Sequence, residues 1–445
     1  MNQKKERWSS VLYMLVTLSI PTIIEEVLAT LIQYVDTAMV GQLGEQATAS
    51  VSVSTTVTWL VNSVPHAIGI GVLALIAKAV GSGDKNLVRR ISSQAVWMVI
   101  GCSIVLGGIS LLLSPYIPIW MGAEASIQGA AGEYFFIISL PMLFRVSSIV
   151  FGAAIRATKD TKTPMLISLG ANIINAVLNY ALIYGVDMGV RGAAIASAIS
   201  YVLSGIMMYV AYRRNEWLHW ELGEIRPDTA ILEQCGRVAL PVLGTSITSC
   251  LGYTVFAGLV SGMGTTIFAA HSIAVTAEEI FYIPGYGFRT ATSTLVGNSL
   301  GERNRDKFRK VSIISVIVTV AMMCVNGVVL YLSAKMLMSF FTPSRAVVDL
   351  GADTGDQVLP LLAGVVGAEG PVPGVGTEHQ LPQQGGRRLQ HGGTVQSIGV
   401  VQEAAHKAHA LCLPLFAHRG LQGTAVQLVQ NGGEGFQIRG LRGAP

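Results

Sequence analysis

The chain has 445 residues, of which 51% are hydrophobic and 13% are charged, whereas an ordinary soluble domain carries about 25% charged residues. This composition excludes most soluble protein classes, and the length accommodates many apolar spans of about 20 residues each. The net charge of +4 is small and spread over short clusters, so the sequence lacks the basic stripe of a nucleic-acid surface. We therefore predict an all-α, multi-pass protein of the plasma membrane that contacts lipid and binds no nucleic acid.

Nine apolar stretches are suitable for transmembrane helices. They run over Val11–Val40, Ala49–Val80, Ile91–Leu113, Gly132–Ile155, Met165–Tyr184, Gly192–Tyr212, Val238–Val260, Ala269–Val296 and Val311–Phe341. The connections alternate in charge, because basic residues crowd 1–7, are absent from 41–48 and return in 85–90. By the positive-inside rule, the amino terminus is cytoplasmic and every even-numbered span returns the chain to that side.

Landmarks of the first half recur 220 residues later without a gap, so the chain contains an internal repeat. The matched positions are Pro21 and Pro241, Gly44 and Gly264, Gly81 and Gly301, and the basic pairs Arg89–Arg90 and Arg309–Lys310. Because six spans separate the copies, both halves begin on the same side of the membrane, as in a two-lobed secondary transporter with its site between the lobes. We expect two six-helix lobes of parallel topology, the second truncated after its third helix.

This repeat divides the chain into an amino-terminal transmembrane lobe (1–212), a cytoplasmic linker (213–232) and a partial carboxy-terminal lobe of three helices (233–345). Residues 346–445 form an atypical tail, rich in Gly, Gln and His, that lacks Met, Trp and Tyr and has no apolar stretch of 18 residues. A shifted reading frame that replaced three spans would explain this tail, and a genuine disordered tail is the alternative. The irregular spacing of its histidines does not indicate a metal site.

Ionisable side chains at membrane depth are costly, and they are therefore candidates for a functional site. Asp36 lies in the first span and shares one helix face with Glu25, Ala29 and Gln33, at steps of three and four residues. A carboxylate there carries a desolvation penalty that a bound proton or Na⁺ would remove, so Asp36 is a candidate binder of a coupling ion. A carboxylate satisfied by a neighbouring helix is the alternative.

Amide side chains of the fifth span offer partners for this carboxylate. Asn172, Asn175 and Asn179 recur at steps of three and four residues, and Ser197 follows in the sixth span. The same amides fit a structural role as hydrogen-bonding groups between helices.

An acidic pair in the eighth span, Glu278 and Glu279, precedes a Pro284–Gly285 step that can bend the helix. These carboxylates could bind a cationic substrate or pair with Arg289. Together with Gln33 and Asn172 they form the predicted substrate cavity, and no residue is assigned a catalytic role.

The stretches around these residues resemble the multidrug and toxic compound extrusion (MATE) family of secondary transporters. They are Pro21 with VDTAMVGQLG, AAIRATKDTKTPM, NAVLNYALIYG, GVRGAAIASA and AAHSIAVTAEEIFYIPGYGFRTATSTLVGNSLG, and the resemblance covers about residues 10–350. It implies twelve spans in two lobes that rock between inward- and outward-facing states and export organic cations in exchange for H⁺ or Na⁺. It also implies that Asp36, Asn175, Asn179 and Ser197 form the cation site of the amino-terminal lobe, with no cofactor and with Na⁺ at Asp36 as the sole metal candidate.

Two positions depart from the family pattern. Many proton-coupled relatives have an acid where this chain has Asn179, so the resemblance leaves the choice between H⁺ and Na⁺ open, and Phe256 stands at the 220-residue equivalent of Asp36. We expect an antiporter rather than an enzyme, acting as a monomer on small organic cations. The alternatives are an inactive truncated transporter product and a flippase for lipid-linked sugars, which would favour a more cationic cavity.

Overall fold

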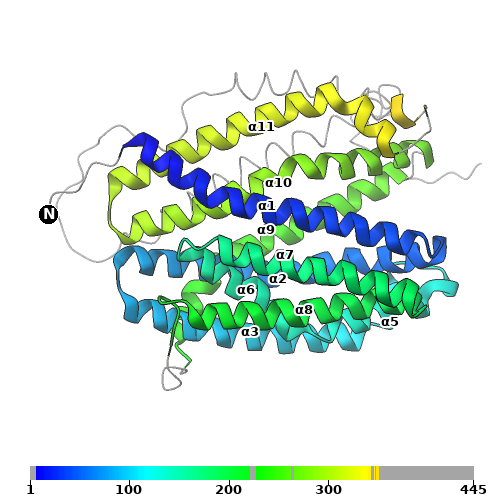
Figure 1. Cartoon of the computed structure of the whole chain (residues 1–445), viewed down its shortest axis with the longest axis horizontal. Helices are drawn as coiled ribbons and strands as arrows, with labels where there is room; N and C mark the ends of the chain where they lie inside the picture. Colours follow the sequence, from blue (N-terminus) through cyan, green and yellow to red (C-terminus); the bar gives the residue numbers. More distant parts are fainter. Residues whose placement is uncertain (1–6, 221–226, 262–264, 342–344, 346, 350–445) are drawn as a thin grey trace, which may run out of the picture.

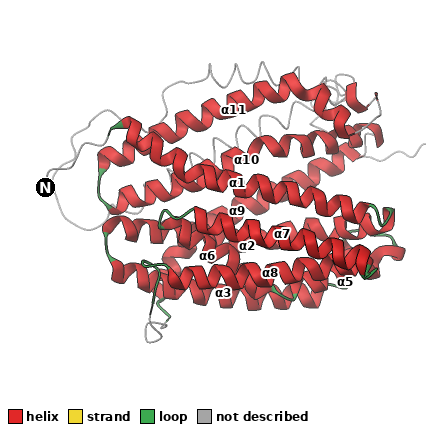
Figure 2. Cartoon of the chain, viewed as in Figure 1, coloured by secondary structure: helices red, strands yellow, loops and turns green. Residues whose placement is uncertain are grey.

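A computed structural model describes residues 7–220, 227–261, 265–341, 345 and 347–349 (Figure 1). Every regular element in these ranges is a helix, and the long helices lie side by side (Figure 2). The predicted all-α membrane fold is therefore confirmed. The predicted tail beyond residue 349 and residues 221–226 of the linker lie outside the described residues, so the domain boundaries stay predictions.

Each of the nine predicted spans corresponds to a long helix or a pair of helices. The elements are α1 (Trp8–Gly41), α2 (Glu45–Ser82), α3 (Lys85–Leu113), α4 (Ile117–Trp120), α5 (Ala125–Ser139), α6 (Met142–Ala157), α7 (Lys162–Tyr180), a π-helical segment η1 (Ala181–Gly185), α8 (Gly189–Arg214), α9 (Thr229–Ser261), α10 (Thr265–Gly301) and α11 (Arg305–Phe341). Among the described residues, α1, α2, α3, α7 with η1, α8 and α11 are long and apolar enough to cross a membrane, and the bent pair α5–α6 makes a seventh candidate span.

The fourth predicted span is not one straight helix. It consists of α5 and α6, which meet at an angle of 54° around Leu140 and Pro141. Proline has no backbone N–H and its ring clashes with the preceding turn, so a helix readily breaks there. The break places a new helix start, that of α6, inside the membrane-spanning segment.

Two short turns with glycine reverse the chain at the ends of α2. Gly44 before α2 has a φ of 106° and Gly83 after it has a φ of 73°, conformations that residues with a Cβ atom rarely adopt. Asp84 then accepts a hydrogen bond from the backbone N–H of Leu87 at 2.9 Å and caps α3. Helices α1, α2 and α3 consequently alternate in direction, as the charge pattern predicts.

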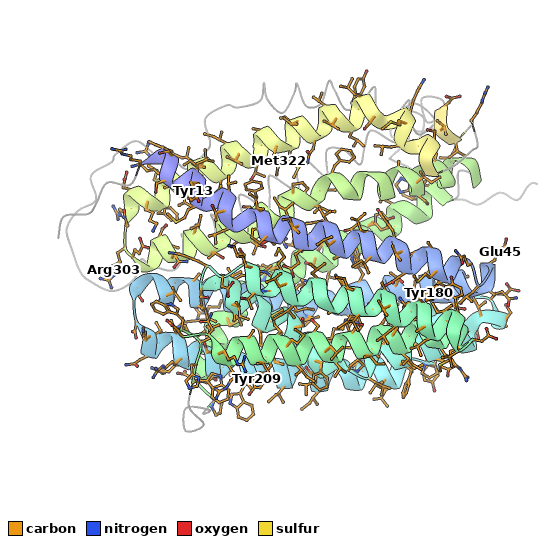
Figure 3. All side chains as sticks on the ribbon, in the orientation of Figure 1. Tyr13, Glu45, Tyr180, Tyr209, Arg303 and Met322 are labelled. Atoms are coloured by element: carbon orange, nitrogen blue, oxygen red, sulfur yellow. The ribbon has the colours of Figure 1, made fainter. Side chains whose placement is uncertain are left out.

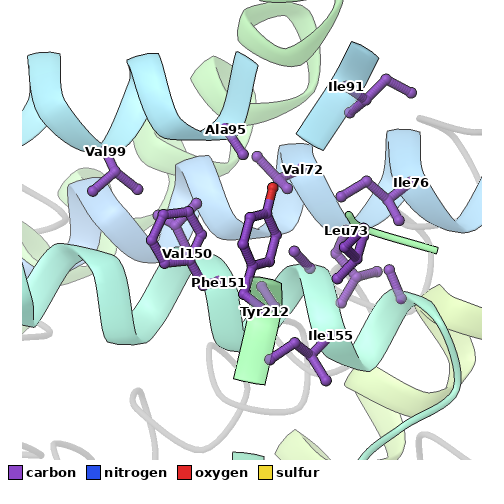
Figure 4. Close-up of a cluster of buried hydrophobic side chains, with 14 of the residues drawn as sticks. Val72, Leu73, Ile76, Ile91, Ala95, Val99, Val150, Phe151, Ile155 and Tyr212 are labelled. Atoms are coloured by element: carbon purple, nitrogen blue, oxygen red, sulfur yellow. The ribbon is translucent and has the colours of Figure 1, made fainter. Parts of the chain in front are cut away.

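The largest apolar core lies where α2, α3, α6 and α8 meet (Figure 4). The Phe151 ring stacks on the Tyr212 ring with centroids 4.4 Å apart, and the Tyr212 hydroxyl donates to the carbonyl of Ser92 at 2.7 Å. Tyr212 is fully buried, so this hydrogen bond satisfies a polar group that neither lipid nor the core could satisfy. The contact holds α8 against α3 at one end of the bundle.

The predicted basic connections, 85–90, 213–214 and 303–310, gather at that end, here called the basic end. Arg303 lies there, whereas Glu45 and Tyr180 lie at the opposite end (Figure 3). The linker rejoins the bundle at the basic end through Asp228, which accepts a hydrogen bond from Arg90 at 2.5 Å and caps α9. The Arg90 guanidinium holds the pKa of Asp228 below its usual range, so the ionised clamp persists at neutral pH and is lost only as the pH falls through that lowered value.

Helices α1–α8 and helices α9–α11, here called the amino-terminal and carboxy-terminal lobes, pack together at the basic end. Val11 and Leu15 of α1 share one buried apolar cluster with Leu295 of α10. Among the described residues, the clusters around Val40 and around Ala270, farther toward the opposite end, each contain residues of a single lobe. The described lobes are therefore closed against each other at the basic end.

Two equivalent glycines of the repeat permit this closure. A Cβ atom added to Gly301 of α10 would overlap the backbone of Lys78 and Ser82 in α2, and one added to Gly81 would overlap the backbone of Asn298. A contact between two equivalent positions is what a pseudo-two-fold axis between the lobes produces. The basic end closes because neither residue has a side chain.

We predict that Gly301→Val opens the basic end, because its side chain would occupy space that α2 backbone fills. The measurement uses Asn298→Cys as the reactive thiol, in a background with the native cysteines replaced. This thiol should react with a water-soluble maleimide about tenfold faster when Gly301→Val is also present. A shift of ~1.4 kcal/mol in the equilibrium between the closed and open states produces that ratio. Gly101→Val is the matched control, since a Cβ atom there meets nothing within 4 Å. Equal labelling rates in the two valine variants would contradict the prediction.

Candidate functional site

Asp36 is hydrogen-bonded to the neighbouring helix α7. The side-chain Nδ2 of Asn179 donates to Asp36 Oδ1 at 2.7 Å. Asp36 is half-buried, and Asn175 and Asn179 are buried. Four residues separate the two asparagines, so the α-helix places both on the face that meets α1.

Helix α8 supplies the third side of this site. Asn175 lies 3.3 Å from the Ser197 hydroxyl, measured from Nδ2 to Oγ. Gly192 near the start of α8 allows the close approach, since a Cβ atom there would lie 3.0 Å from the carbonyl oxygen of Leu182. The four predicted residues Asp36, Asn175, Asn179 and Ser197 thus form one contiguous polar cluster from three helices.

The Asn175 amide has two orientations, which present either its Nδ2 or its Oδ1 to the Asp36 carboxylate. With Nδ2 toward Asp36, it donates to Oδ2 at 2.7 Å and its oxygen accepts from the backbone N–H of Ser197 at 3.2 Å. With Oδ1 toward Asp36, two oxygens stand at a hydrogen-bonding distance, which requires a proton on the carboxylate or a cation between them. One amide rotation therefore suits either charge state of Asp36.

A buried oxygen in the cluster has no donor. Asn179 donates through Nδ2 to Asp36, but its Oδ1 has no hydrogen-bond partner among the described residues. Leaving a buried polar atom unpaired costs about 1–3 kcal/mol. Carboxylate, amide and hydroxyl oxygens are the ligands that hard cations prefer, so the donor set fits a small cation such as Na⁺.

The remaining predicted residues do not join the cluster. Gln33 is exposed and Asn172 is half-buried, and no hydrogen bond in the described part of the chain connects either side chain to Asp36. The side chains of Glu278 and Glu279 lie outside the described residues. At the repeat equivalent of Asp36, the Phe256 ring meets the His271 ring edge-on with centroids 5.3 Å apart.

Sequence reasoning missed Tyr134 on α5. Its hydroxyl interacts with the Ser197 side chain, and its ring packs against the cluster of Val40, one helical turn after Asp36. The aromatic run in which it lies, EYFFIIS, does not by itself indicate which of its rings lies near the site. The bend after Ser139 and the packing of α5 on α8 bring it there.

Glu25 forms a second charged group deeper toward the basic end. It accepts hydrogen bonds from Arg156 of α6 at 2.7 and 2.8 Å and from Ser168 of α7 at 2.7 Å. The Arg156 and Glu25 side chains are only 17% and 10% exposed. This carboxylate, on the predicted face with Asp36, is fully paired and resembles a structural element rather than an ion site.

Comparisons with known proteins identify the family of this chain. The family model MatE matches residues 21–181 and 241–366. The chain belongs to the MATE family. The resemblance predicted from the sequence is thereby confirmed, and this is a multi-pass membrane transporter of that family.

Individual relatives cover most of the chain. It is 30% identical over 342 residues to a probable multidrug resistance protein NorM of Thermotoga maritima, which covers 76% of this chain and 73% of the relative. A protein of the same description from Xanthomonas campestris is 24% identical over 346 residues, covering 75% and 74%.

Solved structures share the fold. The outward-facing conformation of a multidrug resistance MATE family transporter superposes with a TM-score of 0.74 at 21% identity, covering 81% of this chain and 82% of that one. A MATE structure in complex with MaL6 gives a TM-score of 0.75 at 20% identity, covering 91% and 86%.

We predict that Glu25→Ala destabilises the protein by about 3–5 kcal/mol, because it leaves Arg156 buried without its anion. Thermal unfolding of the purified protein in detergent measures the loss. The double variant Glu25→Ala with Arg156→Met should be more stable than Glu25→Ala alone.

Glu133→Ala is the control, since Glu133 pairs with Arg191 where both side chains are well exposed, and such pairs contribute about 0–1 kcal/mol. An equal effect of Glu25→Ala and Glu133→Ala would contradict a structural role for the Glu25 pair.

Proposed function

We propose that this chain is a secondary antiporter of the plasma membrane that exports small organic cations, acting as a monomer. H⁺ or Na⁺ drives the export, and the coupling ion binds at Asp36, Asn175, Asn179 and Ser197. The observation that carries the proposal is the unpaired Asn179 Oδ1 beside the Asp36 carboxylate. The Asp36 carboxylate carries a negative charge and the neighbouring Asn179 oxygen has no donor, so a bound cation would satisfy both. No catalytic chemistry is proposed.

The names of the relatives support the class of substrate, since the Thermotoga maritima and Xanthomonas campestris proteins are described as probable multidrug resistance proteins. The coupling ion and a cationic substrate would compete for, or be linked through, the cavity beside Asp36. Each then biases the equilibrium between two lobe arrangements by its difference in affinity for them.

The orientation follows from the charges. With the amino terminus cytoplasmic, the basic end faces the cytoplasm, as the positive-inside rule requires. The lobes are closed at that end, which on this orientation supports an outward-facing assignment for the described arrangement. Helix α1 carries both Asp36 and the Val11–Leu15 contact with α10, and it is the element through which ion binding would act on the lobes.

We predict that Asp36→Asn lowers export at least tenfold without preventing membrane insertion, because the amide cannot supply the negative charge that the site needs. The measurement is ethidium transport into proteoliposomes under an imposed pH gradient, and separately under an imposed Na⁺ gradient. The gradient that drives transport by the unaltered chain identifies the coupling ion.

Asp187→Asn is the matched control, since Asp187 is an exposed loop carboxylate between η1 and α8. Undiminished ethidium transport in Asp36→Asn would overturn the proposed site. Absence of transport in the unaltered chain would favour the inactive truncated product.

A further inference from the structure

Arg145 is a further charged residue at membrane depth, and it is not part of the cation site. It lies in the first turn of α6, 12 residues before the helix ends at Ala157, which is about 18 Å of helix at 1.5 Å per residue. Because a bilayer core is about 30 Å thick, this position is near its middle. The residue is only 5% exposed, so most of its surface is buried.

Among the described residues, no carboxylate pairs with Arg145. The guanidinium carbon of Arg145 lies 4.8 Å from the centroid of the Tyr201 ring, over its face. No ion pair or hydrogen bond joins it to an acceptor within the ranges that the structure describes. Arg156 and Arg191, by contrast, each pair with a carboxylate. A buried arginine with five N–H donors and no acceptor is incomplete without an anionic group.

The neighbours of Arg145 connect it to the cation site. Tyr134 of α5 packs against one apolar cluster together with Tyr201, and against a second cluster that contains Val40, one helical turn after Asp36. Tyr201 follows Ser197 by four residues, so both lie on one face of α8. Tyr134 therefore lies near both the cation site and the ring that Arg145 contacts.

The packing of α6 on α8 holds the arginine in place. Gly205 of α8 lies directly against the Phe144 backbone, where a Cβ atom would overlap it. One turn farther along α6, the hydroxyls of Ser148 and Ser204 are 2.7 Å apart. The broken span also puts the amino-terminal end of α6 beside Arg145, and helix amino termini inside transporters point at anionic substrate groups.

We propose that Arg145, with the first turn of α6 and Tyr134, binds the carboxylate of a zwitterionic substrate whose cationic group lies toward Asp36. This inference rests on the proposed export function and specifies its substrate class. The site selects molecules with an anion on one side of Tyr134 and a cation on the other. A charge-assisted hydrogen bond to arginine favours the carboxylate over an uncharged ester by about tenfold or more.

The test compares two probes with the same chromophore: rhodamine 6G, a cation whose carboxyl group is an ethyl ester, and its free acid, a zwitterion. Fluorescence anisotropy measures binding of each probe to the purified full chain in detergent. The unaltered chain should bind the free acid at least about tenfold more tightly than the ester. Arg145→Gln should abolish this preference by weakening binding of the acid, while affinity for the ester changes less than about threefold.

Arg191→Gln is the matched control, since Arg191 is exposed and paired on the surface, and it should leave the preference unchanged. Arg145→Lys keeps a positive charge and should keep part of the preference, and it serves as the test variant if Arg145→Gln does not fold. Equal affinity of the unaltered chain for the two probes, or an intact preference in Arg145→Gln, would overturn the inference.

The outcomes separate this inference from the proposed function. Binding and transport of rhodamine 6G that depend on Asp36, without any preference for the free acid, would overturn the anion site alone. No binding or transport of either probe by the unaltered chain would overturn both.

Discussion

The bilayer core contains no water, so every polar group at that depth must find its partner inside the protein. Three charged side chains of the amino-terminal lobe differ in how completely they are paired with other groups of the protein. The Glu25 carboxylate is fully paired, because Arg156 and Ser168 donate hydrogen bonds to it. Asp36 receives amide donors but leaves the Asn179 oxygen unused, and Arg145 has an aromatic face and no anion among the described residues. Incomplete pairing marks the places where an ion or a substrate would bind.

Helix α1 relates the polar sites to the arrangement of the lobes. Its first half packs against α10 at the basic end, and its second half carries Asp36 against α7. In the described part of the chain, α1 and α2 meet α10 at the basic end through apolar side chains and through the close approach of Gly81 and Gly301. Such a contact separates without leaving a charge unpaired, which suits an interface that opens and closes.

The proposed substrate site would have a polarity, with Asp36 at one end and Arg145 at the other. The Asp36 side favours a cation, and the Arg145 side favours an anion. Helix α8 spans both through Ser197 and Tyr201, one turn apart. Discrimination among substrates in a hydrophobic cavity is weak when it depends on shape alone, and it becomes strong where buried charges require a matching partner. The broken span α5–α6 is central here, because it positions both Tyr134 and Arg145.

The sequence by itself determined the helical class and the family, and it predicted the positions of the long helices and the residues of the proposed cation site. These features follow from hydropathy and from helical periodicity, which are local properties of the chain. Only the tertiary structure decided that Gln33 and Asn172 stand apart from Asp36, that Glu25 is paired with Arg156, and that Arg145 lies over the Tyr201 ring. Periodicity places a residue on a face of its helix, but it does not say which helix that face meets. That choice depends on the break at Pro141 and on glycine contacts between distant segments.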